Sequence, residues 1–153
     1  MKKIILKNLA DTRKLAKDTA KKLKGGEVIA LSGPLGSGKT TFVQFLAKAL
    51  GVKQAVRSPS FIILQIFNLQ ATSYKLKPKL LCHVDCYRLK NADELAALGL
   101  LDYLGKPSVI TVIEWAEKIK KVLPSKTIWL RFQYSKSGRN VTLVLPHRGI
   151  LAP

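Results

Sequence analysis

Acidic residues are scarce in this sequence. Nine aspartates and glutamates stand against 27 lysines and arginines, which gives a formal net charge of +18 over 153 residues, and nine of the cations precede Gly25. Such a charge favours polyanionic partners, of which RNA, DNA and the ribosome are the candidates for a cytosolic protein. Solubility alone, or a basic proteome in the source organism, would produce the same charge. The charge therefore indicates proximity to nucleic acid without naming a site.

Long apolar runs are also absent. No run approaches the roughly 18 to 20 residues that a membrane-spanning helix needs. The N-terminal segment MKKIILKNLADTRK has an apolar patch of only three residues, too short for the core of a secretory signal. The first expected helix lacks bulky aromatic residues on its apolar side, which disfavours a membrane surface as well. We therefore expect a cytoplasmic protein without a membrane partner.

Cysteine is rare, and the two cysteines give no disulfide framework. Both lie in the segment LCHVDCYRL, where a metal cluster is a possible interpretation. If this segment is a strand, alternation puts Cys82 and Cys86 on one face and His83 and Asp85 on the other. Ligands on two faces cannot close around one ion, so we expect buried structural thiols.

The rest of the sequence alternates strand and helix patterns and then forms a hairpin, with no internal repeat and no interdomain linker. Asp11 can cap the first helix and Gly25-Gly26 can end it. The sequence predicts one α/β domain over residues 1–153, with a mostly parallel sheet and antiparallel edge strands. Expected strands cover 3–6, 27–32, 61–67, 80–85, 108–115, 127–134 and 141–146, and expected helices cover 11–23, 40–50 and 91–104.

The segment GPLGSGKTT, from Gly33 to Thr41, matches the pattern G-x-x-x-x-G-K-[ST]. Its glycines allow the backbone to curl with the N–H groups turned inward, where they and the start of the next helix form a nest for phosphate oxygens. In this pattern Lys39 reaches the β- and γ-phosphates, and the Thr40 hydroxyl coordinates Mg²⁺. The sequence therefore predicts nucleotide binding and a three-layer P-loop NTPase fold.

Two carboxylates stand at the ends of expected strands. Glu114 ends an apolar strand at the edge where ligands of open α/β sheets gather, and it is the expected second Mg²⁺ ligand. A carboxylate that merely faces solvent is the alternative. Asp85 ends another strand, with His83 on its face. Asp85 could orient the attacking water, lie beside the Mg²⁺ ligands, or serve as a structural partner for Arg88.

The sequence also lacks features of two P-loop classes. No N-K-x-D motif is present to recognise guanine, and Asp85 is not followed by the D-x-x-G spacing of GTPases. Adenine is therefore the expected base. A small-molecule kinase would need an arginine-rich lid over the phosphates, whereas the arginines here are few and dispersed.

Four motifs occur in the order GPLGSGKTTF, SPSF, HVDCYRL and IEW, and together they resemble the TsaE family over nearly the whole chain. This family is the small ATPase needed for threonylcarbamoyladenosine on bacterial tRNA. The resemblance implies ATP and Mg²⁺ as cofactors. It also implies a TsaB–TsaD-like complex as partner, slow hydrolysis that the partner stimulates, a nucleotide-gated switch loop, and tRNA reached directly or through the complex.

The resemblance further implies roles for residues at matching positions. Thr40 and Glu114 would bind Mg²⁺, while Lys39, Asp85 and Glu114 would be needed for hydrolysis. Trp115 would help to form the active surface, with core packing as its alternative. The phosphate-binding residues would be Leu35, Gly36, Ser37, Gly38, Lys39, Thr40 and Thr41; the switch-like loop would be Ser58, Pro59 and Ser60; and Glu117, Gly138 and the chain around 9–12 would border the nucleotide.

Three features depart from the family pattern. Pro34 replaces the usual acidic residue after the first glycine, the segment between Phe61 and His83 is longer than usual, and the chain is more basic. Two other functions stay open. One is a kinase that phosphorylates a small molecule, and the other is a basic RNA-binding module that uses a nucleotide structurally.

Overall fold

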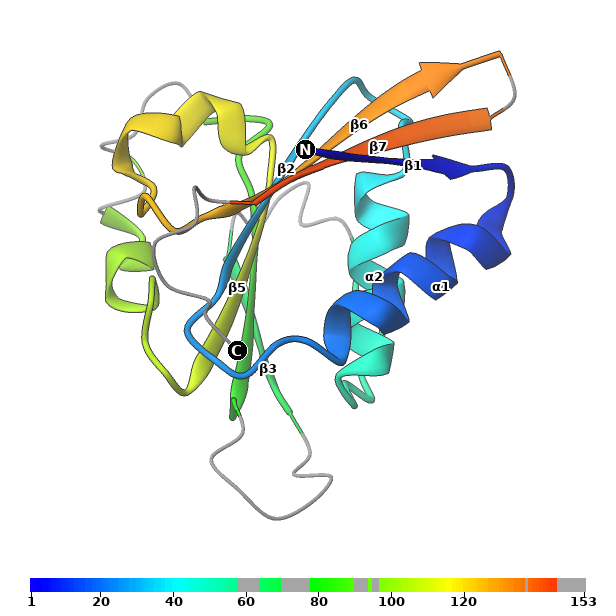
Figure 1. Cartoon of the computed structure of the whole chain (residues 1–153). Helices are drawn as coiled ribbons and strands as arrows, with labels where there is room; N and C mark the ends of the chain where they lie inside the picture. The colour runs from blue at the N-terminus through cyan, green and yellow to red at the C-terminus, as the bar shows by residue number, and fades with distance from the viewer. Residues whose placement is uncertain (58–63, 70–77, 90–93, 95–96, 137, 146–153) are drawn as a thin grey trace.

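The structure of the protein is a computed structural model that describes residues 1–57, 64–69, 78–89, 94, 97–136 and 138–145 (Figure 1). Strands and helices alternate through most of the chain. The elements in order are β1 (Lys2–Leu6), α1 (Leu9–Ala20), β2 (Val28–Ser32), α2 (Lys39–Ala49), β3 (Leu64–Asn68), β4 (Leu80–Asp85), the 3-10 segment η1 (Leu100–Asp102), β5 (Val109–Glu114), the 3-10 segment η2 (Ala116–Val122), β6 (Ile128–Ser135) and β7 (Gly138–Val144).

All strands join one 7-stranded sheet in the order β1-β7-β6-β2-β5-β4-β3. The four central strands, β6, β2, β5 and β4, run parallel, and β2 pairs with β6 on one side and β5 on the other. The pairs β1–β7, β6–β7 and β3–β4 are antiparallel. The predicted mostly parallel sheet with antiparallel edges is therefore confirmed.

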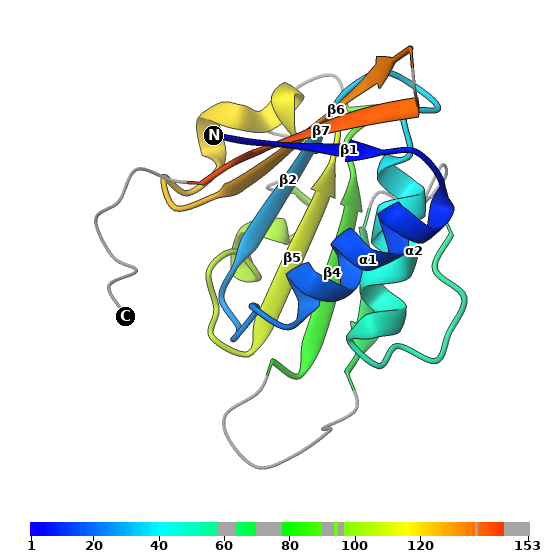
Figure 2. The same ribbon diagram turned by 45° about the vertical axis from the view of Figure 1, so that its right-hand side comes forward.

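The sheet forms the middle of three layers. Helices α1 and α2 cover one face, and η1 and η2, drawn in yellow-green and yellow, lie on the other (Figure 1, and Figure 2 from a second angle). Alternation along β5 sends Ile110 and Val112 into the core under the helices, while Val109 and Ile113 enter the core under η1 and η2. Strand β2, of sequence VIALS, is apolar up to its last residue, Ser32, because both of its faces are covered.

The first helix differs from its prediction at both ends. It begins at Leu9 after Asn8, whose Oδ1 accepts a hydrogen bond from the Asp11 N–H at 3.0 Å. The Asp11 carboxylate instead accepts from the Lys7 N–H at 2.8 Å. The prediction that Asp11 is the cap was wrong, because the two residues divide the capping hydrogen bonds between them.

The predicted end of this helix was also wrong. Helix α1 ends at Ala20, before Gly25-Gly26. Gly25 has a φ of +110°, and a Cβ atom there would lie 2.0 Å from the carbonyl oxygen of Pro107. The glycine is needed for the close approach of two loops rather than for a helix end.

The helix expected over 91–104 is interrupted. Residues 94 and 97 are helical, but Gly99 takes the left-handed conformation at a φ of +70°. The chain then forms only the short η1 segment. The expected cap, Asn91, lies outside the described residues, as does the part of the expected strand 61–67 that precedes Leu64.

Candidate active site

The glycine loop connects the central strand β2 to helix α2. Gly33, Gly36 and Gly38 have φ values of +133°, +73° and +99°, which favour glycine. A Cβ atom on Gly33 would lie 2.2 Å from the carbonyl oxygen of Phe132, so the loop also passes very close to β6. Gly38 precedes the first turn of α2, whose N–H groups have no partner within the helix. The loop and the start of α2 therefore supply backbone donors of the kind that bind anions.

Lys39 is buried at the start of α2, with 4% of its surface exposed. Its Nζ donates hydrogen bonds to the carbonyl oxygens of Gly33 at 2.7 Å and Pro34 at 2.9 Å. The same ammonium group lies 4.0 Å from the ring centroid of Trp115. Lys39 therefore holds the two ends of the glycine loop together and faces an aromatic surface.

The charges around Lys39 act in opposite directions on its pKa. Burial lowers the pKa of Lys39 below its ordinary value, and this effect is only partly offset by the carboxylates of Glu114, Glu117 and Asp85. Glu117 lies exposed on η2, close enough to act on this group. A single ammonium group therefore stands opposite three acids, in a region where electrostatic interactions are stronger than in water.

Glu114 connects three elements through its two carboxylate oxygens. Oε2 accepts a hydrogen bond from the Thr40 hydroxyl on α2 at 2.7 Å, and Oε1 lies 3.0 Å from Nε2 of His83 on β4. Glu114 is 1% exposed and His83 is fully buried. The alternative in which Glu114 faces solvent is therefore wrong. The structure brings the hydroxyl and the carboxylate predicted as partners into direct contact.

Asp85 lies in register with Glu114 at the ends of the neighbouring parallel strands β4 and β5. Its side chain is 8% exposed, and Oδ1 accepts a hydrogen bond from the Tyr87 N–H at 2.9 Å. Because residues in register share a face, Asp85, Glu114 and His83 all face the side of the sheet covered by α2.

Cys82 and Cys86 face the opposite side of β4, in the core under η1 and η2. Both are free thiols and fully buried. Burial raises the pKa of each to about 12. Within the described ranges no group of three or more His, Cys, Asp or Glu side chains could hold a metal ion. The prediction of buried thiols is confirmed.

Trp115 follows Glu114 in an unusual conformation. It has a φ of +56°, and no other non-glycine residue in the described part of the chain has a positive φ. Its ring lies 5.0 Å from that of Tyr87 and packs partly against the core under η1 and η2. Trp115 thus packs against this core and also lies beside the ammonium group of Lys39, and its part in an active surface stays a prediction. Backbone strain of this kind is typical of functional sites.

The remaining predicted residues lie in the glycine loop, at the start of β7, at the start of α1, or outside the described residues. Leu35 is 71% exposed, whereas Ser37 is fully buried and its hydroxyl has no partner among the described residues. Gly138 begins β7, where a Cβ atom would lie 2.5 Å from the carbonyl oxygen of Leu6. The segment 9–12 forms the first turn of α1. Ser58, Pro59 and Ser60 lie outside the described residues.

Two residues at this loop were missed from the sequence. Tyr134 donates its hydroxyl hydrogen to the carbonyl oxygen of Leu35, and Arg139 Nη2 lies 3.4 Å from that of Gly36. They come from β6 and β7, about a hundred positions further along the chain. An arginine directly after the predicted nucleotide-bordering Gly138 was the available signal, but the arginines were interpreted as dispersed.

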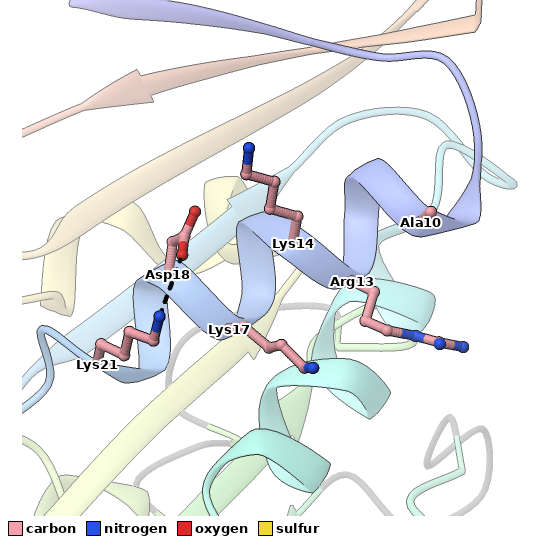
Figure 3. Close-up of a pocket in the computed structure, with 6 residues that line it drawn as sticks. All are labelled: Ala10, Arg13, Lys14, Lys17, Asp18 and Lys21. Carbon is pink, nitrogen blue, oxygen red and sulfur yellow. Dashed lines mark ion pairs between the residues drawn. The ribbon is translucent and has the colours of Figure 1, made fainter.

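A basic hollow lies away from this site, on the outer side of α1. Figure 3 shows its side chains spreading from successive turns of the helix, with the ion pair between Asp18 and Lys21 at 3.9 Å drawn as a dashed line. The hollow is lined by Ala10, Arg13, Lys14, Lys17, Asp18 and Lys21.

None of the helices in the described ranges is long and apolar enough to cross a bilayer.

Comparison with known proteins gives consistent results. Residues 6–141 match the family model of the threonylcarbamoyl adenosine biosynthesis protein TsaE. A tRNA threonylcarbamoyladenosine biosynthesis protein TsaE of Aquifex aeolicus is 42% identical over 122 residues, covering 78% of this chain and 80% of the relative. One of Bacillus subtilis is 37% identical over 121 residues, covering 79% and 70%.

The fold is similar to that of a solved structure, YdiB of Bacillus subtilis. The TM-score is 0.64 at 27% sequence identity, and the match covers 95% of this chain and 84% of that one. Together with the succession of buried strand, glycine loop and helix in this chain, the similarity supports the predicted P-loop NTPase fold.

Proposed function

The chain belongs to the TsaE family, and from this premise we propose that it binds and hydrolyses ATP with Mg²⁺ in the threonylcarbamoyladenosine modification of tRNA. One observation carries the proposal. The Thr40 hydroxyl donates to the buried Glu114 carboxylate at 2.7 Å, directly beside the buried Lys39 and the glycine loop. A site of this kind holds a hydroxyl, a carboxylate and an ammonium group at the place where a helix start attracts phosphate.

The donor atoms around Glu114 are suited to Mg²⁺. This ion prefers oxygen ligands and is usually held by one or two protein groups together with phosphates and water. Thr40 and Glu114 supply two such oxygens from adjoining elements. His83 contacts the other carboxylate oxygen at 3.0 Å and so orients Glu114, as partners of metal ligands commonly do. When bound, the ion would neutralise phosphate charge.

Lys39 and the loop amides would hold the phosphates. The present partners of Lys39 Nζ are neutral carbonyl groups of the loop. Phosphate oxygens are charged acceptors and form stronger hydrogen bonds, so they would replace these partners. The loop residues 35–41 would supply the amide donors, while Glu117, Gly138 and the segment 9–12 would border the rest of the nucleotide.

Asp85 is the proposed group for orienting the attacking water, because it lies in register with Glu114 on the neighbouring strand. The loop Ser58 to Ser60 is the proposed switch, which γ-phosphate would order and hydrolysis would release. A loop of this kind acts on a partner surface. We propose that the partner is a TsaB–TsaD-like complex and that it stimulates slow ATP hydrolysis.

The proposed contact with tRNA, made directly by this chain or through the complex, has a candidate surface on α1. Arg13 and Lys14 lie exposed on one turn of this helix, and Lys17 lies exposed on the next. Asp18 pairs with Lys21, but both are well exposed, and such pairs contribute little. This face therefore keeps a positive potential that favours a phosphate backbone.

The proposal is tested by ATP hydrolysis with and without a TsaB–TsaD complex, using Lys39→Ala and Glu114→Ala. We expect each variant to lose at least about a hundredfold in hydrolysis, the magnitude found when a single charge-stabilising group is removed from an active site, and to lose tRNA modification as well. Lys48→Ala, an exposed lysine on the same helix, is the control and should behave as wild type. Hydrolysis that is already maximal without the complex would contradict the proposal. Transfer of phosphate from ATP to an acceptor molecule would favour the kinase alternative. A variant that no longer hydrolyses ATP but still binds RNA and keeps its function would favour the RNA-binding module.

A further inference from the structure

The β6–β7 hairpin extends beyond the central strands and lies beside the glycine loop, as both Figure 1 and Figure 2 show. The residues on one face of this hairpin divide into a pair inside the core and a pair beyond it. Phe132 and Val141, which form a cross-strand pair, are fully buried in the core. The next pair on that face, Tyr134 and Arg139, lies beyond the core. These two side chains are the ones that contact the loop carbonyls.

The contacts act on two consecutive peptide groups. Tyr134 donates to the carbonyl oxygen of Leu35, and Arg139 donates to that of Gly36 at 3.4 Å. In a planar trans peptide the C=O and the following N–H point in opposite directions. A carbonyl held toward the hairpin therefore turns the next N–H away from it. The two groups affected are the N–H of Gly36 and the N–H of Ser37.

The orientation of the Ser37 amide agrees with this geometry. Its N–H is directed across the loop toward the carbonyl oxygen of Pro34, at 3.3 Å. That oxygen also accepts from Lys39 Nζ, so the Ser37 amide faces the same interior as the buried ammonium group. These donors lie where phosphate oxygens are expected in a loop of this pattern.

The side chains of the hairpin also come close to two glycines of the loop. A Cβ atom on Gly36 would lie 2.9 Å from the Tyr134 hydroxyl, and one on Gly38 would lie 3.4 Å from Cδ of Arg139. The guanidinium group thus spans the loop from Gly36 to Gly38. Nε of Arg139 is buried and has no hydrogen-bond partner among the described residues, whereas Nη2 contacts the carbonyl oxygen of Gly36.

We infer that Tyr134 and Arg139 are positioning residues that hold the glycine loop in its phosphate-binding conformation and thereby set the affinity for the nucleotide. This inference rests on the proposed ATP-binding function. A loop that is already oriented before the nucleotide arrives loses less conformational freedom on binding. Removing either contact should therefore weaken binding of the phosphates while leaving the chemical step intact, because the two side chains act on the carbonyls of Leu35 and Gly36 rather than on the groups proposed for hydrolysis.

The test measures ATP and ADP affinity by calorimetry, together with KM and kcat in the presence of the partner complex, for Tyr134→Phe, Arg139→Met and the double variant. We expect each single substitution to lower the affinity for both ATP and ADP about two- to tenfold, the range for the loss of one hydrogen bond. KM should rise by the same factor, and kcat should stay unchanged. Arg139→Lys should restore part of the affinity, since it keeps the charge but not the fork of donors.

Tyr103→Phe and Arg131→Met are the matched controls, because Tyr103 lies after η1 and Arg131 lies on the opposite face of β6 from Tyr134. Melting temperatures separate a local effect from unfolding, and Tyr134→Phe removes only one oxygen from a side chain that is 58% exposed. If the wild-type chain binds ATP and the Tyr134 and Arg139 variants bind it with the same affinity, the inference is overturned and the proposed function is not. A fall in kcat without a rise in KM would also overturn the inference. A wild-type chain that binds no ATP would overturn the proposed function, and this inference with it.

Discussion

At the scale of single residues, the site depends on polar groups that are buried and paired. Glu114 and His83 are almost completely removed from solvent, and each oxygen of the carboxylate has a partner. A buried carboxylate without such partners would cost several kcal/mol by order of magnitude. The Thr40 and His83 contacts therefore keep Glu114 in one orientation, which the proposed role as a metal ligand requires.

The two thiols give a prediction at the same scale. Cys82 and Cys86 are fully buried, and burial raises the pKa of each to about 12 from an ordinary value of 9.0. Because the thiolate is the reactive form, we expect neither cysteine to react with iodoacetamide at pH 8 in the folded protein, and both to react in denaturant. Mass spectrometry counts the adducts. A labelled native protein would contradict the burial of these side chains.

The same shift predicts how stability depends on pH. The pKa of each thiol is higher in the folded protein than in the unfolded chain. The contribution of the protonated, buried thiols to the free energy of unfolding is therefore fully present below pH 9. As pH rises from about 9 toward 12, the unfolded chain releases these protons first, and the free energy of unfolding falls. Substitution of both cysteines by alanine should flatten this alkaline decline, which denaturant unfolding at several pH values measures.

At the scale of elements, the start of α1 provides a test of the corrected cap. Asn8 accepts the Asp11 N–H at 3.0 Å. We expect Asn8→Ala to lower the free energy of unfolding by about 1 kcal/mol, the usual value for removal of an N-cap side chain. Asn8→Asp keeps an acceptor at the cap and should retain most of the stability. Equal unfolding midpoints in urea for wild type and Asn8→Ala would show that the cap is not formed.

Element boundaries were harder to predict than element types. The central strands β2 and β5 were recognised because they are short and largely apolar. The segment 91–104 has the apolar spacing of a helix, but Gly99 takes a left-handed conformation and the helix does not continue. Local apolar spacing does not show where a glycine will leave the helical conformation, because glycine adopts positive and negative φ about equally readily.

At the scale of the whole molecule, the charge of +18 predicts salt-dependent binding of polyanions. If the outer side of α1 contacts tRNA, the double variant Lys14→Glu, Lys17→Glu should weaken tRNA binding. The slope of log K against log salt should also become shallower by about 1 for each phosphate that the variant no longer neutralises. Fluorescence anisotropy at several salt concentrations measures both quantities.

The control for this experiment is Lys106→Glu, Lys126→Glu, which makes the same charge change at exposed lysines outside α1. It should bind tRNA more tightly than the α1 variant does, because the helix face would still be intact. An equal weakening of tRNA binding in the two double variants would indicate attraction by total charge rather than by this helix.

Much of the site was predicted from residue order alone. The glycine loop, with its lysine and threonine, was predicted from its spacing, which is itself a constraint of phosphate chemistry. The two carboxylates were predicted from their places at the ends of expected strands. The alternation of strands and helices likewise led to the parallel sheet, since burial on both faces demands continuous apolar strands.

Other features exist only once the chain is folded. The contact between His83 and Glu114 joins residues 31 positions apart, and the hairpin contacts join residues 99 and 103 positions apart. No local pattern marks such pairs, because each depends on the order of strands in the sheet and on their register. The physical reason is that propensity and spacing act over a few residues, whereas the packing of strands brings distant side chains within hydrogen-bonding distance.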